Sequence, residues 1–175
     1  MNRLDLESFI NNLLKPELFE DYCPNGLQIE GKDEIKKIVF AVSATKESID
    51  FSVENKADAL VVHHGLFWKF HGTKTITGPF SKRVKPLIQN DINLFGYHLP
   101  LDGHESLGNA ASLAKLLELE ECSPFGIYKG CATGVKGVFK QAIDSKTLIK
   151  NLTAITNHSV LYSNPADSNA KIKNS

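Results

Sequence analysis

Two adjacent histidines, His63 and His64, are the residues in this sequence best suited to chemistry. They follow an apolar run, 59–62, that contains two β-branched valines and is too short for a helix core, so it predicts a buried strand. In open α/β sheets, ligands bind just beyond the carboxyl ends of the strands. Because imidazole is a ligand for zinc, iron, copper and nickel, the pair indicates a candidate metal site.

The geometry of a strand limits how this pair can act. Adjacent side chains on an extended strand point to opposite faces. His63 and His64 would therefore hold two neighbouring ions, or one ion if the chain kinks at Gly65, a residue that tolerates unusual dihedral angles. The alternative interpretation is a buried, hydrogen-bonded histidine beside one on the surface.

A second cluster, His98 and Asp102, follows the next predicted strand. If the two strands are parallel neighbours, their ends bring all four side chains to the same sheet edge. Imidazole and carboxylate together bind first-row transition metals, and an aspartate can bridge two ions of a hydrolytic site. Taken alone, Asp102 fits a turn or helix-capping acid and His98 a packed strand end. The two clusters together favour a metal site.

Further polar residues in neighbouring loops are weaker candidates. His104 and Glu105 lie in the same loop as Asp102 and could donate or accept a proton near a metal-bound water, or they are solvated loop residues. Lys69 and Lys74 could meet a phosphate, and His71 could line the mouth of a pocket. Side chains on such loops more commonly face water.

The elements that must position these residues alternate between strand and helix. We expect helices at 4–14, 45–56, 82–90, 109–118 and 145–156, and strands at 37–43, 58–62, 92–97, 132–140 and 158–162, with a turn-rich loop at 21–31. Strand, helix and strand within about 25 residues predict βαβ units with a right-handed crossover. The predicted class is α/β, a mostly parallel sheet with flanking helices. The pattern changes near residue 120, which predicts a metal-site α/β domain at 1–122 and a second α/β lobe with a frayed tail at 123–175.

Composition excludes several classes of protein. The 175 residues hold 20 basic and 20 acidic side chains, so the formal net charge is zero and no nucleic-acid partner is expected. Cys23, Cys122 and Cys131 form no C-x-x-C pair, which argues against a zinc ribbon and suits a reducing cytosol. No apolar run approaches the ~18 residues of a membrane span, and the N-terminus lacks a signal-peptide pattern. We therefore expect a soluble cytoplasmic protein with no membrane partner.

Four stretches of the chain resemble one family. They are DYCPNGLQIEG at 21–31, VVHHGLFWK at 61–69, NDINLFGYHLPLD at 90–102 and LGNAASLAKLL at 107–117. On these stretches the chain resembles the Nif-three-like dinuclear-metal proteins, and most of all the YbgI-type members labelled type-two GTP cyclohydrolase I homologues. The resemblance covers residues 1–118 closely and 119–171 loosely.

The resemblance implies a toroidal homohexamer with a two-metal site in each subunit, facing an internal cavity. The family's ligands map onto His63, His64 and Asp102, with His98 close by or ligating; zinc, iron, manganese and nickel are not distinguished. The implied substrate is a nucleotide such as GTP, whose purine imidazole ring is opened by hydrolysis to give formate and a dihydroneopterin triphosphate. Water activated at the metals would attack the ring carbon between the two nitrogens, and a nearby acid would protonate the leaving nitrogen.

The sequence departs from this family at its end. The family carries a C-terminal segment in which a Gly-His-His-Ala-Thr-Glu-like motif supplies a remaining histidine and a bridging glutamate. This sequence stops near residue 175, before that motif, so its C-terminal part is expected to be incomplete by about a third of the family's length. If the chain is the whole product, we expect poor metal binding and no activity. The alternative function is a non-enzymatic metal-binding or protein-interaction scaffold of the same family.

Overall fold

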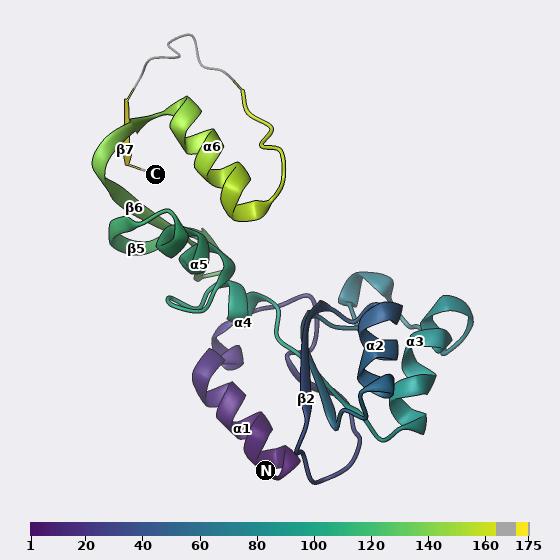
Figure 1. Ribbon diagram of the computed structural model, residues 1–175. Helices are drawn as coiled ribbons and strands as arrows, with labels where there is room; N and C mark the ends of the chain where they lie inside the picture. Colours follow the sequence, from purple (N-terminus) through teal and green to yellow (C-terminus); the bar gives the residue numbers. More distant parts are fainter. Residues whose placement is uncertain (164–170, 175) are drawn as a thin grey trace. The chain divides into compact units, whose positions relative to one another are not determined.

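The computed structural model describes residues 1–163 and 171–174. The chain divides into two compact units between Leu101 and Asp102, inside a short helix, α4 (Leu99–Asp102). The mixed α/β class predicted from the sequence is confirmed (Figure 1). None of the helices in the described residues is long and apolar enough to cross a bilayer.

The first unit is built on a four-stranded sheet in the order β1-β4-β3-β2. Its strands are β1 (Gly26–Ile29), β2 (Ile38–Ser43), β3 (Ala59–His64) and β4 (Asn93–Gly96). The pairs β2–β3 and β3–β4 are parallel, as the βαβ pattern predicts, and β1 pairs with β4 in the antiparallel sense. The stretch 21–31, expected as a loop, therefore contributes an edge strand.

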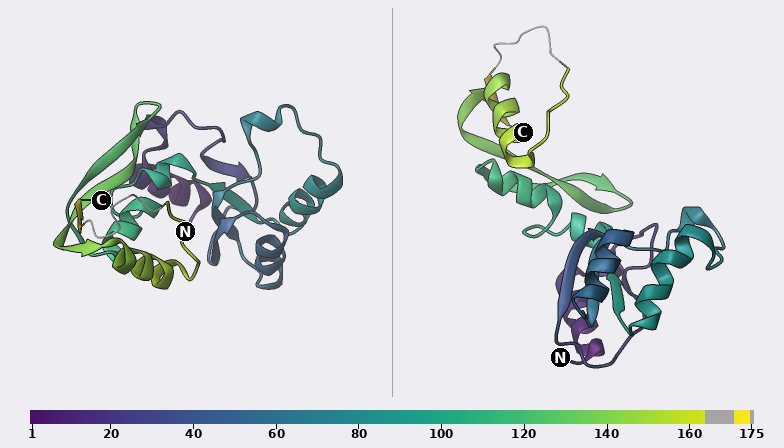
Figure 2. Two further views of the ribbon diagram at one scale, coloured as in Figure 1. Left: turned by 90° about the horizontal axis from the view of Figure 1, so that it is seen from above. Right: turned by 45° about the vertical axis from the view of Figure 1, so that its right-hand side comes forward.

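Helices cover both faces of this sheet, as the views in Figures 1 and 2 show. Helix α1 (Arg3–Leu14) lies on one face, and α2 (Lys46–Glu54) and α3 (Gly78–Gln89) lie on the other. Short 3₁₀ turns, η1 (Pro16–Leu18) and η2 (Lys69–His71), lie in the connections. Each of these three helices lies close to its predicted position, because the apolar residues whose spacing predicted the helix include the residues that it buries.

Two apolar clusters hold the layers together. On the α1 face, Leu6 and Ile10 pack against Phe95 of β4. On the other face, residues of α2 and α3 pack against Leu60 and Leu94, which are fully buried. Burying one such side chain contributes about 1.5–3 kcal/mol relative to leaving it in water, so the central strands β3 and β4 are the most firmly held part of the unit.

Local hydrogen bonds set where the helices begin. The side chain of Asn2 accepts from the Leu4 amide at 2.8 Å and caps α1, and Thr45 caps α2 by accepting from the Ser48 amide at 3.2 Å. Such caps contribute about 1 kcal/mol each, because they satisfy amides that have no partner inside the helix. At the other end of α1, Lys15 takes a left-handed conformation immediately before Pro16, which cannot continue the helix.

The second unit is organised around a hairpin of β5 (Leu119–Tyr128) and β6 (Cys131–Asp144). Lys129 and Gly130 link the strands with φ of 48° and 87°, the positive values that a two-residue hairpin turn requires. Helix α5 (Asn109–Leu116) packs against both strands, α6 (Ser145–Thr156) follows β6, and β7 (Lys171–Asn174) pairs antiparallel with β6.

Some elements of the second unit differ from the sequence expectation. The stretch 158–162 is not a strand, and β5 was not expected. The two compact units divide between residues 101 and 102, and helix α5 packs against β5 and β6 of the second unit. The domain boundary expected at residue 122 stays a prediction.

A buried carboxylate, Asp58, anchors the segment that precedes β2. It accepts hydrogen bonds from the amides of Lys36 and Lys37 at 2.7 and 2.8 Å, and it lies 2.7 Å from the Lys32 ammonium. Burial alone would raise its pKa, but these interactions outweigh burial and lower the pKa from 3.8 to about 2. The ionised form is therefore the one that the folded state favours.

Asp58 should make the free energy of unfolding of this chain depend on pH in the acid range. Because its folded pKa lies below the unfolded value, its contribution is present above about pH 4 and is lost as the pH falls towards about 2. We expect this contribution to be about 2 kcal/mol. Urea unfolding at several pH values, compared for the parent and Asp58→Asn, measures it. Equal acid sensitivity in both proteins would contradict the prediction.

Candidate metal centre

Three of the predicted site residues, His63, His64 and His98, lie together at one edge of the first sheet. His63 and His64 end β3, and His98 follows β4, which pairs with β3 in parallel. Their ring centroids are 4.3 Å apart for His63–His64, 4.9 Å for His63–His98 and 5.7 Å for His64–His98. Each offers a ring nitrogen within 4.8 Å of the others. Three converging imidazoles are a donor set that suits a first-row transition metal.

The approach of His63 and His64 differs from the simple strand argument. Adjacent side chains were expected to diverge, with Gly65 allowing a kink, yet the two rings meet edge to face at 4.3 Å. The backbone of Gly65 does not have a positive φ. Its lack of a side chain serves a different purpose, because a Cβ there would lie 2.2 Å from Oε1 of Gln28.

The Gln28 side chain locks the backbone around the histidines. Its Oε1 accepts from the Leu66 amide at 2.9 Å, and its Nε2 donates to the Pro24 carbonyl at 2.8 Å. Gly65 and Gly96 provide the space, since a Cβ at either position would lie within 2.5 Å of the Gln28 amide group. This amide therefore ties β1 to the segment that leaves β3.

Two of the three histidines are held by hydrogen bonds at Nδ1. The Nδ1 atom of His64 lies 2.9 Å from Oγ of Ser43, its partner in the β2–β3 register. The Nδ1 atom of His98 lies 2.9 Å from Oδ1 of Asp21. In the His98 ring Nε2 is then the nitrogen left for a metal, an arrangement typical of metal-binding histidines.

Asp21 is a buried residue that the sequence argument missed. Its carboxylate also accepts from the amides of Tyr22 and Leu99 at 2.6 and 2.8 Å, and from Nδ2 of Asn25 at 3.0 Å. Burial raises its pKa, but these hydrogen bonds and the one from His98 outweigh burial, and the net pKa is lowered. Asp21 is therefore an anion at neutral pH. In the sequence, the only sign of this role is an aspartate next to a turn, which the sequence analysis interprets as part of a loop.

Cys23 lies beside Asp21 and forms a second group of possible ligands. One ligand atom from each of Asp21, Cys23 and His98 lies within 4.8 Å of the others. Cys23 is buried, and burial together with the Asp21 charge raises the pKa of its thiol to about 12. The thiol is therefore protonated at neutral pH, which makes this group a poorer metal site than the three histidines.

Aromatic side chains border the histidine cluster. The Trp68 ring lies edge to face with His98 at 5.1 Å and stacks on Phe70 at 5.4 Å, and its Nε1 donates to the Gly65 carbonyl at 3.1 Å. Phe70 is 69% exposed, and its ring also meets that of His71 edge to face at 4.7 Å. Lys69 donates to the Asp21 carbonyl at 2.7 Å, which ties the aromatic segment to the loop that holds His98.

The family described as Duf34/NIF3 (NGG1p interacting factor 3) matches residues 1–174, almost the entire chain. The chain belongs to the Duf34/NIF3 family. This match confirms the family resemblance seen in the four sequence stretches.

Named relatives of this Duf34/NIF3 chain agree with that assignment. The protein called GTP cyclohydrolase 1 type 2 homolog in Haemophilus influenzae is 46% identical over 162 residues, which cover 92% of this chain and 63% of that relative. The homolog of the same name in Vibrio cholerae is 45% identical over 167 residues, covering 94% and 65%. The chain thus spans slightly less than two thirds of the length of these relatives.

Solved structures similar to this Duf34/NIF3 chain share its whole described fold. The protein ybgI, described as of unknown function, has a TM-score of 0.86 and 36% identity, covering 99% of this chain and 68% of its own. A protein from Thermus thermophilus, TTHA1606, has the same TM-score of 0.86 at 29% identity, covering 99% and 69%.

The remaining predicted site residues of this Duf34/NIF3 chain begin its second unit. Asp102 ends α4, and its Oδ1 accepts from Nδ2 of Asn109 at 2.8 Å. The Nδ1 atom of His104 accepts from the Leu107 amide at 3.2 Å, and Glu105 is exposed. Asp102 as a metal ligand, and His104 and Glu105 as catalytic residues, stay predictions.

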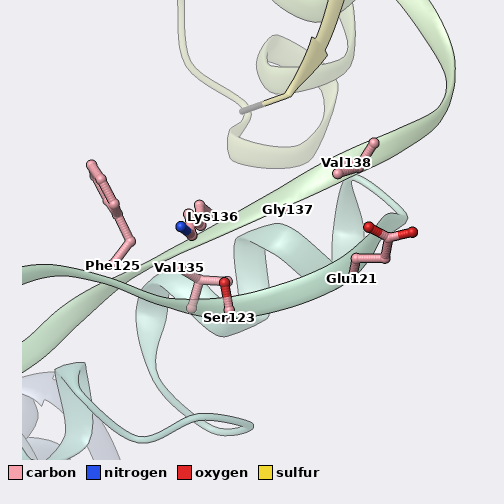
Figure 3. Close-up of a pocket in the computed structure, with 7 residues that line it drawn as sticks. All are labelled: Glu121, Ser123, Phe125, Val135, Lys136, Gly137 and Val138. Carbon is pink, nitrogen blue, oxygen red and sulfur yellow. The ribbon is translucent and has the colours of Figure 1, made fainter.

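Among the described residues of this Duf34/NIF3 chain, each of the two units has a surface hollow of note. The first, of about 610 Å³, is lined by residues that include Asp21, Cys23 and Lys69. The second, of about 510 Å³, lies on the β5–β6 hairpin between Phe125, Lys136 and Glu121 (Figure 3). Its lining has no histidine or cysteine, so the second hollow lacks the donors of a transition-metal site.

Proposed function

We propose that this chain carries the metal-binding part of a dinuclear-metal-dependent hydrolase that opens the imidazole ring of a purine nucleotide such as GTP. The observation that carries the proposal is the convergence of His63, His64 and His98 at the carboxyl edge of the sheet. The name of the similar proteins, GTP cyclohydrolase 1 type 2 homolog, supports the substrate class.

Each candidate residue has a role in the proposed reaction. His63, His64 and His98 hold divalent ions through ring nitrogens, and Asp102 adds a carboxylate; zinc, iron, manganese and nickel all suit this set. Bound ions of this kind lower the pKa of water and polarise a substrate, which is the chemistry that hydrolysis of a C–N bond needs. His104 and Glu105 supply the proton that the leaving ring nitrogen takes up.

The first test combines metal analysis with a formate-release assay. The purified chain is loaded with Zn²⁺, Fe²⁺, Mn²⁺ or Ni²⁺ in turn, its metal content is measured, and formate is followed with GTP, ATP and their nucleosides. Metal-dependent formate release supports the hydrolase. Bound metal without turnover of any purine would favour the alternative, a non-enzymatic metal-binding or protein-interaction scaffold.

Phe70 offers a prediction about substrate binding. A purine ring that stacks on the exposed part of Phe70 would have the Phe70 ring between it and Trp68, at the outer end of the aromatic segment that borders the histidine cluster. Stacking of this kind contributes about 1–3 kcal/mol per base. We expect Phe70→Ala to raise the KM for GTP about tenfold with little change in kcat or metal content. Phe70→Tyr is the matched control and should keep the parent KM. A kcat that falls while KM is unchanged would contradict the prediction.

The proposal includes assembly into a homohexamer in the cytoplasm, with no membrane or nucleic-acid partner. Support for self-association comes from the sheet edge, where Phe40 and Val42 of strand β2 are 73% and 71% exposed. Exposed apolar side chains on an edge strand commonly mark an interaction surface. Light scattering coupled to size-exclusion chromatography measures the mass of the assembly, and a monomer at micromolar concentration would contradict it.

A further inference from the structure

The carboxylate of Asp21 is buried and hydrogen-bonded to a histidine of the centre, His98. Its side chain is only 2% exposed, and it lies 2.9 Å from Nδ1 of His98. The loop that carries it is tied to the His98 segment a second time, because the His98 amide donates to Oδ1 of Asn25 at 2.8 Å. Two separate hydrogen bonds therefore fix both the backbone and the ring of His98.

The hydrogen bonds of Asp21 decide between two roles, metal ligand and positioning residue. Oδ1 accepts from His98 Nδ1 and the Tyr22 amide, and Oδ2 accepts from Asn25 Nδ2 and the Leu99 amide. Two carboxylate oxygens offer about four acceptor positions, so these donors occupy all of them. A metal at Asp21 would have to displace a buried donor and leave that donor without a hydrogen-bond partner, which is unfavourable.

The same contacts determine which ring nitrogen of His98 carries the proton. An ionised carboxylate can only accept, so the ring nitrogen facing it, Nδ1, must donate. In the neutral ring Nε2 is then an unprotonated acceptor, which is the form a metal binds. Asp21 thus selects the competent tautomer and prevents the ring from turning.

We propose that Asp21 is a positioning residue of the metal centre, which holds His98 with its proton on Nδ1 and presents Nε2 to the ion shared with His63 and His64. The inference rests on the proposed metal centre. It adds to the proposed function a residue outside the predicted ligand set.

The variant Asp21→Asn tests this role. An amide has one acceptor oxygen in place of two, so it cannot satisfy all the donors around it, and an NH₂ group facing His98 would donate to Nδ1 and move the ring proton to Nε2. We expect the affinity for Zn²⁺, measured by competition with a chromophoric chelator, to fall about 10–100-fold. An affinity within about twofold of the parent would overturn the proposal.

Asp58→Asn is the matched control for a purely structural effect. Asp58 is also buried, accepts two backbone amides and has one side-chain donor, but it lies at the opposite end of β3 from the histidines. We expect this variant to lose stability and keep the parent affinity for Zn²⁺. Equal loss of Zn²⁺ affinity in both variants would overturn the positioning role.

A second measurement needs no variant. Nitrogen-15 spectra of the histidine rings in the metal-free parent protein, at alkaline pH, report which nitrogen of His98 is protonated. We expect the proton on Nδ1, and a proton on Nε2 would overturn the proposal. Neither readout involves GTP, so the positioning role can hold while formate release fails, and the two failures are distinguishable.

Discussion

Replacing His64 with alanine is expected to lower the affinity for Zn²⁺ by more than about 100-fold and to abolish any metal-dependent turnover. The effect should exceed that of Asp21→Asn, because His64 is a proposed ligand and Asp21 only positions one. The ring of His64 lies 4.3 Å from that of His63 and 5.7 Å from that of His98, so its removal leaves only two imidazoles in the cluster. The side chain is partly exposed at a strand end, and the fold should survive. Chelator competition measures the affinity, and circular dichroism verifies the fold.

His158 provides the control for this experiment. It is exposed and lies outside the histidine cluster, so His158→Ala removes an imidazole without touching the centre. We expect the parent content of Zn²⁺ in that variant. Full retention of tightly bound Zn²⁺ in His64→Ala would show that the cluster is not the metal site.

Gly65→Ala is expected to destabilise the first unit by about 3 kcal/mol, because overpacking of a filled site forces its neighbours to move. The new Cβ would lie 2.2 Å from Oε1 and 2.4 Å from Nε2 of Gln28. That side chain cannot simply swing away, since it bonds both the Leu66 amide and the Pro24 carbonyl. Urea unfolding measures the loss, and a reduced Zn²⁺ affinity should accompany it because Gly65 follows His64 directly.

A double variant shows whether the clash with Gln28 is the cause. Gln28→Ala alone should cost stability, because it removes two hydrogen bonds and leaves the Leu66 amide without this acceptor. If Gln28 is the obstacle, Gly65→Ala should cost much less when Gln28 is already alanine, which is a non-additive result. Additive losses would place the origin of the strain elsewhere.

The histidine cluster could be predicted because it depends on strand order alone. The apolar runs before His63 and His98 indicate strands, and the intervening helical pattern makes those strands parallel neighbours. Their carboxyl ends must then meet at one edge, whatever the details of packing. The convergence of adjacent rings was not foreseen, because it depends on local geometry at the end of a strand.

Asp21 and β1 could not be predicted because their partners are distant in the chain. The stretch 21–31 is rich in turn residues, and nothing within it indicates that 26–29 pairs with β4. The bond from His98 to Asp21 spans 77 positions. A carboxylate beside a turn is ordinary in isolation, and only the tertiary structure shows the donors gathered around it.

This long-range contact can form only when both of its residues have left the ribosome, and they leave it far apart in time. Asp21 is synthesised first, followed by His63 and His64. His98, the imidazole partner of Asp21, is synthesised after all three. A nascent chain that has not yet reached β4 therefore lacks both the third imidazole and the contact that orients it. If the cluster holds the proposed ion, the ion can therefore be bound by all three imidazoles only after β4 has been synthesised and has paired with β3.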